Sequence, residues 1–171
     1  IEKSISKTVE ALNNGDIELA GKIMEGDEQV DRAQKKIENI CFNLIVEQQP
    51  VAKDLRTITA ALKMVTDMER IGDHAADISE ITVFLAKNNI KVNFDHIGKM
   101  ATETVMMLNH SIEAYVERDR EKARKVIEHD DVVDELFNQV KNDIIAHIRS
   151  NPNAGEEAAD LLMVAKYFER I

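Results

Sequence analysis

The segment Met68-Glu69-Arg70-Ile71-Gly72-Asp73-His74-Ala75-Ala76-Asp77 places a carboxylate at every fourth residue, at Glu69, Asp73 and Asp77. Four residues make about one turn of an α-helix, so in a helix these side chains stack on one face, about 6 Å apart. Like charges at this spacing repel one another by about 0.2–0.5 kcal/mol per pair. The segment therefore predicts a cationic partner, and a set of oxygen ligands favours a hard metal ion.

The composition favours an all-α protein. Of the 171 residues 44% are hydrophobic, which is enough for a packed core in one domain or two small ones. Only 2 prolines and 6 glycines punctuate the chain, and 4% of the residues are aromatic. No run of alternating apolar and polar residues indicates a strand, so we expect helices throughout.

Charge and cysteine content exclude several functional classes. The formal net charge is −10, from 22 basic and 32 acidic residues, which argues against binding nucleic acid through its phosphates. No apolar run approaches the roughly 18 residues of a membrane span, so we expect a protein that is at most peripheral to a membrane. The single Cys41 fits a cytoplasmic location, and its apolar neighbours predict a buried thiol.

Helix caps and breakers divide the chain into segments. Asp16 and Asp119 are good N-cap residues, Gly26 is a candidate terminator, and Asn88-Asn89 is the clearest linker. Helices are expected over residues 2–12, 16–25, 27–48, 51–86 and 94–117, in a short segment after 119, over 130–149, and from 156 onward. Two apolar stripes predict the packing faces, one with Val30, Ala33, Ile37, Ile40 and Leu44, the other with Leu55, Ile58, Leu62 and Val65.

The second half of the chain repeats the first. Asp16, Ala20, Ile23, Asp27, Val30 and Asp31 recur 103 positions later as Asp119, Ala123, Val126, Asp130, Val133 and Asp134. Leu62, Glu69, Arg70 and Ile71 recur 100 positions later as Leu162, Glu169, Arg170 and Ile171. The repeat predicts two similar three-helix bundles, over residues 1–88 and 89–171, with the last helix of the second bundle incomplete.

The repeat also gives the carboxylate ladder a facing pair. Asp27 and Asp31 lie one turn apart, and adjacent helices joined at Pro50 run antiparallel, which brings this pair toward the ladder. We therefore expect a groove that binds metal through Asp27, Asp31, Glu69, Asp73 and Asp77. A second set would consist of Asp130, Asp134 and Glu169.

Simpler interpretations of these acids stay open. Asp27 and Asp130 could cap helix N-termini, where a carboxylate suits the macrodipole. Arg70, Arg56 or Lys53 could neutralise the ladder in place of a metal. His74 could be a ligand or a surface residue. The chain has no Glu-x-x-His motif of the ferritin-like di-iron bundles, no Walker A loop and no zinc-ligand spacing.

Several motifs in order along the chain resemble the PhoU family of phosphate-transport regulators. They are Asn14-Gly15-Asp16, Asp27-x-x-x-Asp31, Gln49-Pro50-Val51-Ala52-x-Asp54-Leu55-Arg56, Met68–Ala75, Asp119, Asp130-x-x-x-Asp134 and Phe168-Glu169-Arg170-Ile171. The resemblance implies two tandem, pseudo-symmetric three-helix bundles. It also implies that the acidic motifs hold metal clusters, with iron in some members and other divalent ions elsewhere.

The resemblance further implies a function without catalysis. Members repress phosphate uptake and the phosphate-starvation response, through contacts with the ATPase subunit PstB of the phosphate ABC transporter and with the sensor kinase PhoR. Many members form homodimers. Where the family continues with Asp-His and a full helix, this chain ends at Ile171. We therefore expect either a fragment or an incompletely ordered chain, whose second metal site lacks the counterparts of Asp73 and Asp77.

Two rival functions remain at the level of the sequence. One is a metal-dependent hydrolase or oxidase built on a carboxylate bundle, since such sites support that chemistry. The other is a helical scaffold that binds no metal. Carboxylates accept divalent or trivalent ions, among them iron, zinc, manganese, magnesium and calcium, so the sequence leaves the identity of the metal open.

Overall fold

The computed structural model describes residues 1–90 and 95–171 and confirms the all-α prediction. The described residues form six helices: α1 (Glu2–Asn14), α2 (Ile17–Gln48), α3 (Ala52–Lys87), α4 (Asp95–Glu117), α5 (Arg120–Ser150) and α6 (Gly155–Arg170). For the helix predicted over residues 94–117, the predicted start at residue 94 lies outside the described residues. The division of the chain between residues 88 and 89 stays a prediction.

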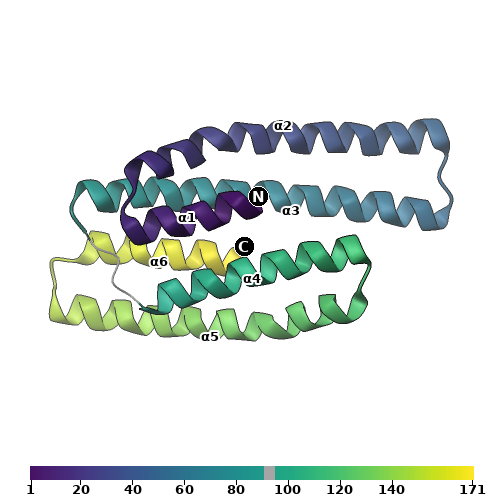
Figure 1. Cartoon of the computed structure of the whole chain (residues 1–171). Coiled ribbons are helices and arrows are strands. Elements are labelled where there is room, and N and C mark those ends of the chain that lie inside the picture. The colour runs from purple at the N-terminus through teal and green to yellow at the C-terminus, as the bar shows by residue number, and fades with distance from the viewer. Residues whose placement is uncertain (91–94) are drawn as a thin grey trace.

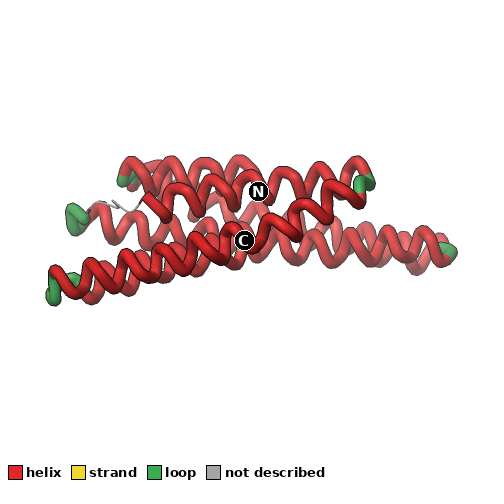
Figure 2. Tube along the Cα trace, turned by 90° about the horizontal axis from the view of Figure 1, so that it is seen from below, coloured by secondary structure: helices red, strands yellow, loops and turns green. Residues whose placement is uncertain are grey.

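The helices form two groups of three that lie side by side (Figure 1). Helices α2 and α3 make a long antiparallel pair with α1 beside part of it, and α4 and α5 make a second pair with α6. The groups touch through α3 with α6 and through α1 with α4. Seen after a quarter turn, all the helices run along one long axis (Figure 2). None of the described helices is long and apolar enough to span a membrane.

The predicted caps form at the starts of α2 and α5. The Asp16 carboxylate accepts a hydrogen bond from the Leu19 N–H at 2.9 Å, and the Asp119 carboxylate accepts from the N–H groups of Glu121 and Lys122. Gly15 ends α1 with a φ of 63°, a left-handed conformation that glycine adopts without steric cost. Each three-helix group therefore opens with the same turn between its first two helices.

Two predicted helix breaks are wrong. Helix α2 passes through Gly26 and Asp27 without interruption, and α5 passes through Asp130 in the same way. A glycine inside a helix costs about 1 kcal/mol relative to alanine, and a helix of this length tolerates that cost when its flanking residues are packed. Asp27 and Asp130 consequently lie in helix interiors and cap no helix.

The two groups share one hydrophobic core. Its largest cluster joins Leu12, Ile78 and Leu85 of the first three helices to residues of the last three. Phe168 of α6 is the bulkiest side chain in this cluster and is 1% exposed. The buried Cys41 confirms the prediction of an inaccessible thiol.

The predicted apolar stripe of α2 is only partly buried. Val30 is partly covered, whereas Ile37, Ile40 and Leu44 are 40%, 50% and 42% exposed. The reason is the geometry of the first group: α1 lies beside only one portion of the much longer α2–α3 pair (Figure 1). The carboxylate ladder lies near the middle of α3, where the pair passes from the covered portion to the uncovered one.

Candidate metal centre

Three of the predicted ligands meet across the α2–α3 contact. Asp27 and Asp31 of α2 and Asp73 of α3 each present an oxygen, and these oxygens all lie within 4.8 Å of one another. Asp27 and Asp31 are partly buried and Asp73 is exposed. Three carboxylates from two helices thus surround one small volume, a donor set that suits a hard cation.

Gly72 allows the two helices to approach this closely. A Cβ atom placed on Gly72 would lie 3.0 Å from Asp27 Oδ1 and 3.2 Å from Val30 Cγ1, both tighter than ordinary van der Waals contacts. The glycine immediately precedes Asp73, so the residue that permits the contact also brings the third carboxylate to it. A side chain at this position would require Asp27 and Val30 to shift by a few tenths of an ångström.

Asp27 is the most constrained acid of the group. Its Oδ1 atom is buried and accepts no hydrogen bond from the residues that the structure describes. Because Asp27 lies inside α2, the backbone N–H groups that would satisfy an N-cap carboxylate are already used within the helix. A buried carboxylate oxygen without a donor is costly, and a bound cation would remove that cost.

Burial and neighbouring negative charges raise the pKa values of two acids in this group. Burial raises the pKa of Asp27 above 3.8, and the charges of Asp73, Asp31 and Asp77 raise it further. Burial likewise raises the pKa of Glu69 above 4.5, with added repulsion from Asp73, Asp31 and Asp27. Glu69 therefore belongs to the same electrostatic group, although it lies outside the set of three close oxygens.

Basic side chains do not neutralise this group. Arg70 lies 3.9 Å from Asp67, which also binds Lys63 at 2.9 Å. Over residues 1–90 and 95–171, neither Arg56 nor Lys53 forms an ion pair with any acid of the ladder or its facing pair. Among the described residues these three side chains thus form no ion pair with the group, and the charge of Arg70 lowers the pKa of Glu69 by less than burial and the neighbouring carboxylates raise it.

Asp77 and His74 lie at the contact between α3 and α6. The His74 ring packs against Tyr167, with centroids 5.2 Å apart, and its Nδ1 lies 3.8 Å from an Asp77 oxygen. Burial lowers the pKa of His74 below 6.5, and the nearby Arg170 charge lowers it further. His74 is thus neither a member of the carboxylate group nor a free surface residue, and it joins the two halves of the molecule.

Comparison with known proteins identifies the family. The family model described as the PhoU domain matches residues 1–82 and again residues 97–171, which together make up most of the chain. The chain belongs to the PhoU family. The predicted resemblance is confirmed, and the two matched stretches correspond to the two groups of three helices.

Named PhoU relatives align along nearly the whole chain. The phosphate-specific transport system accessory protein PhoU homologue of Clostridium acetobutylicum is 38% identical over 99% of this chain and 78% of its own length. The homologue of Aquifex aeolicus is 36% identical over 99% of this chain and 77% of its own. The crystal structure of PhoU from Pseudomonas aeruginosa superposes with a TM-score of 0.94 at 25% identity, covering 99% of this chain and 81% of that one.

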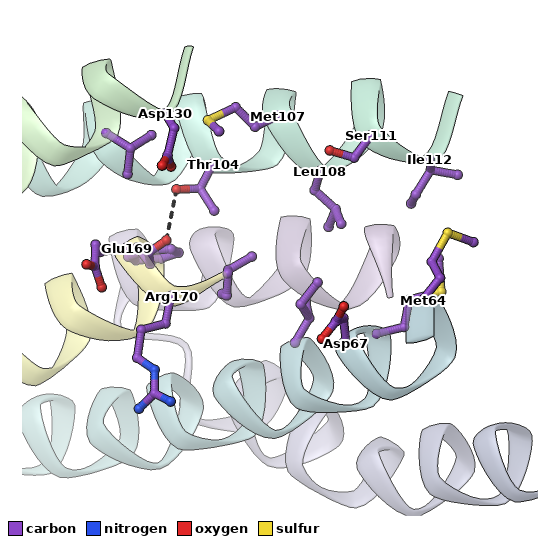
Figure 3. A pocket seen from close by; sticks show the side chains of 15 residues that line it. Met64, Asp67, Thr104, Met107, Leu108, Ser111, Ile112, Asp130, Glu169 and Arg170 are labelled. Atoms are coloured by element: carbon purple, nitrogen blue, oxygen red, sulfur yellow. Dashed lines mark hydrogen bonds between the residues drawn. The ribbon is translucent and has the colours of Figure 1, made fainter. Parts of the chain in front are cut away.

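The second PhoU repeat assembles its acids less completely. Asp130 of α5 and Glu169 of α6 line one cavity of about 400 Å³, on the side where the Thr104 hydroxyl donates to the Phe168 carbonyl (Figure 3). Asp134 is exposed and lies outside this lining, and Lys166 Nζ lies 2.6 Å from Glu169 Oε2. The set of Asp130, Asp134 and Glu169 stays a prediction, with one of its acids already paired.

The close contact of α2 and α3 at Gly72 has one sign in the sequence, a glycine among the acids of a long helix. A glycine inside a long helix has no propensity advantage, so Gly72 is a candidate for a close helix contact. Gly26 also precedes an acid inside a long helix, yet no described residue lies within 4 Å of a Cβ added there, so the sequence alone does not distinguish the two glycines. No comparable signal marked Tyr167 as the partner of His74, because the crossing of α3 and α6 depends on the packing of the two halves.

The Gly72 contact gives a first prediction. Gly98→Ala on α4 should raise the free energy of unfolding by about 1 kcal/mol, the usual gain from replacing a helical glycine, since none of the described residues lies within 4 Å of the added Cβ. Gly72→Ala should lose that gain, because Asp27 and Val30 must shift. Urea unfolding of both variants measures the difference, and an equal stabilisation by the two substitutions would show that Gly72 imposes no constraint.

A second prediction concerns Asp27 in the metal-free protein. Because its pKa is raised in the folded state, ionisation of Asp27 destabilises the fold as the pH rises above 3.8. Asp27→Asn should therefore be no more stable than wild type at low pH. At neutral pH it should be more stable, by about 0.2–0.5 kcal/mol for each like-charged neighbour. Thermal unfolding in chelator between pH 3 and pH 7 tests this, and a loss of stability at neutral pH would indicate a stabilising carboxylate instead.

Proposed function

We propose that this chain is a metal-binding adaptor that represses phosphate uptake and the phosphate-starvation response when phosphate is plentiful. Membership of the PhoU family supports this role, as do the names of its relatives. The structure from Streptococcus pneumoniae is titled the phosphate transport system regulatory protein PhoU and superposes with a TM-score of 0.88 at 25% identity. A regulator of this kind acts on the phosphate ABC transporter, through its ATPase PstB, and on the sensor kinase PhoR.

The meeting of Asp27, Asp31 and Asp73 is the observation that supports a metal. These three residues would hold the ion, and Glu69 lies close enough to add its negative charge. A bound ion would supply positive charge between α2 and α3 and so fix the register of the two helices. Iron, zinc, manganese, magnesium and calcium are the candidates, because all accept carboxylate oxygen.

We propose a binding role in preference to catalysis, because the relatives are named as accessory and regulatory proteins. The proposed setting is the cytoplasm, at the inner face of the membrane that holds the transporter. We also propose a homodimer as the working form, following the family resemblance. Metal at the α2–α3 contact would then act on partners by stiffening the first three helices.

Asp31→Asn tests the metal directly. Asp31 supplies one of the three close oxygens, so its loss should weaken binding of Mn²⁺ by more than about tenfold, measured by calorimetry on chelator-treated protein. Glu47→Gln is the matched control, since Glu47 is an exposed carboxyl on the same helix, remote from the group. Equal binding by both variants would refute the site.

The same two variants test whether the metal serves regulation. In the native host without its own copy of the gene, the wild-type gene should restore repression of a phosphate-starvation promoter in phosphate-rich medium. Glu47→Gln should also restore it, whereas Asp31→Asn should leave the promoter active. Full repression by Asp31→Asn would separate the regulatory role from the metal.

A further inference from the structure

The turns that join the first two helices of each repeat have a similar backbone and different charges. Residues 118–125 follow residues 15–22 at the offset of 103 that relates the repeats, and Arg118 has a φ of 55° where Gly15 has 63°. Residues 118–125 hold five basic and two acidic side chains, a net charge of +3 in a chain of −10. Residues 15–22 hold one basic and two acidic side chains, a net charge of −1. Because the first turn forms without the additional basic groups, the fold does not require them in the second.

A groove of about 710 Å³ lies between this second turn and α3. Arg118 and Arg120 line it from the turn and the start of α5, and Arg56 lines it from α3. Figure 1 shows the turn between α4 and α5 beside the first part of α3. Among the described residues, α3 packs directly against neither α4 nor α5, so the groove separates helices that are not in contact.

The acids near the turn do not compensate these arginines. Asp119 is the one acid among the described residues of the lining, and its carboxylate accepts hydrogen bonds from the N–H groups of Glu121 and Lys122 at the start of α5. Glu113 and Glu117 of α4 both bind Lys122, at 3.0 Å and 2.7 Å, and neither lines the groove. These three carboxylates are thus engaged by other groups.

The three arginines are available to a ligand. Over residues 1–90 and 95–171, none of them forms an ion pair with a carboxylate. All three are exposed. A guanidinium group donates two parallel hydrogen bonds to a phosphate or a carboxylate. With three arginines and one capped aspartate in the lining, charge complementarity selects an anionic ligand.

The rest of the lining is mainly apolar and poorly covered. Tyr115, Val116 and Ile127 are 38%, 72% and 74% exposed and lie in the same groove as the arginines. The volume of the groove falls within the roughly 300–1,000 Å³ of small-molecule sites. A ligand that matches the groove therefore has an apolar part beside its negative charges.

We propose that this groove binds a nucleoside polyphosphate. The guanidinium groups would pair with the phosphates, and the apolar lining would cover the base and the sugar. Inorganic phosphate offers the charge without the apolar part, and a nucleoside offers the reverse, so each alone should bind more weakly. None of the predicted metal ligands lines the groove, so the proposal depends neither on the metal centre nor on the proposed function.

The binding test uses the whole chain and a fluorescent analogue of ATP. Fluorescence anisotropy in chelator, which keeps divalent ions out of the measurement, should show saturable binding of one nucleotide per chain. Unlabelled ATP should displace the probe, and added salt should weaken its binding. Adenosine and inorganic phosphate should displace it only at concentrations more than about tenfold higher, because each lacks one of the two sets of contacts.

Substitution of single arginines then locates the binding. Arg118→Gly removes a guanidinium and gives the turn the residue that its counterpart Gly15 already has, so it should fold at least as stably as wild type. It should bind the probe about tenfold or more weakly, as should Arg56→Gln on the opposite side of the groove. Arg124→Gln is the matched control, because Arg124 is an exposed arginine of α5 outside the lining, and it should bind as wild type does.

Three results would overturn the proposal. The first is the absence of saturable nucleotide binding, and the second is a loss of binding in Arg124→Gln as large as in Arg118→Gly or Arg56→Gln. The third is binding of an acidic peptide or of phosphatidylglycerol vesicles that both groove substitutions abolish and that ATP does not displace. That last result would assign the groove to a protein partner or to a membrane surface.

Discussion

The close contact of α2 and α3 at Gly72 is the constraint on which the candidate site depends. Without a side chain on Gly72, Asp27 and Val30 pack directly against the α3 backbone, and the carboxylates of Asp27, Asp31 and Asp73 converge. Close packing and charge repulsion act in opposite directions at this point. The apolar contacts of the helix pair bring together acids that repel one another, and a bound cation would offset that repulsion.

Helix α3, which forms one side of this contact, also packs against the second repeat. The hydrophobic core is continuous across the two repeats, and Phe168 of α6 lies in the same cluster as Ile78 and Leu85 of α3. Helix α3 therefore contributes to the candidate metal centre on one face and to the contact between the repeats on another, where His74 packs against Tyr167. A change in the α2–α3 register at the acids would reach the second repeat through the same helix.

Much of the fold and of the candidate site was predictable, because a repeated sequence restricts the possible folds. The order of helices, the caps at Asp16 and Asp119 and the facing of Asp27 and Asp31 toward Asp73 all followed from spacing and periodicity. The false break at Gly26 arose because a terminator and a tolerated interior glycine have the same local signature. The exposure of Ile40 and the position of Asp77 depend on which helices cover which part of α3, and no local pattern determines that.

We propose that the carboxylates of the first repeat form a cation site through the packing of α2 against α3. Anomalous X-ray diffraction from crystals grown with Mn²⁺ tests it most directly. We expect an anomalous peak at about 2.0–2.6 Å from oxygens of Asp27, Asp31 and Asp73. The proposal would be contradicted if crystals grown in saturating Mn²⁺ showed no anomalous density between α2 and α3. The same crystals would then show the Asp27 Oδ1 atom hydrogen-bonded to a neighbouring group.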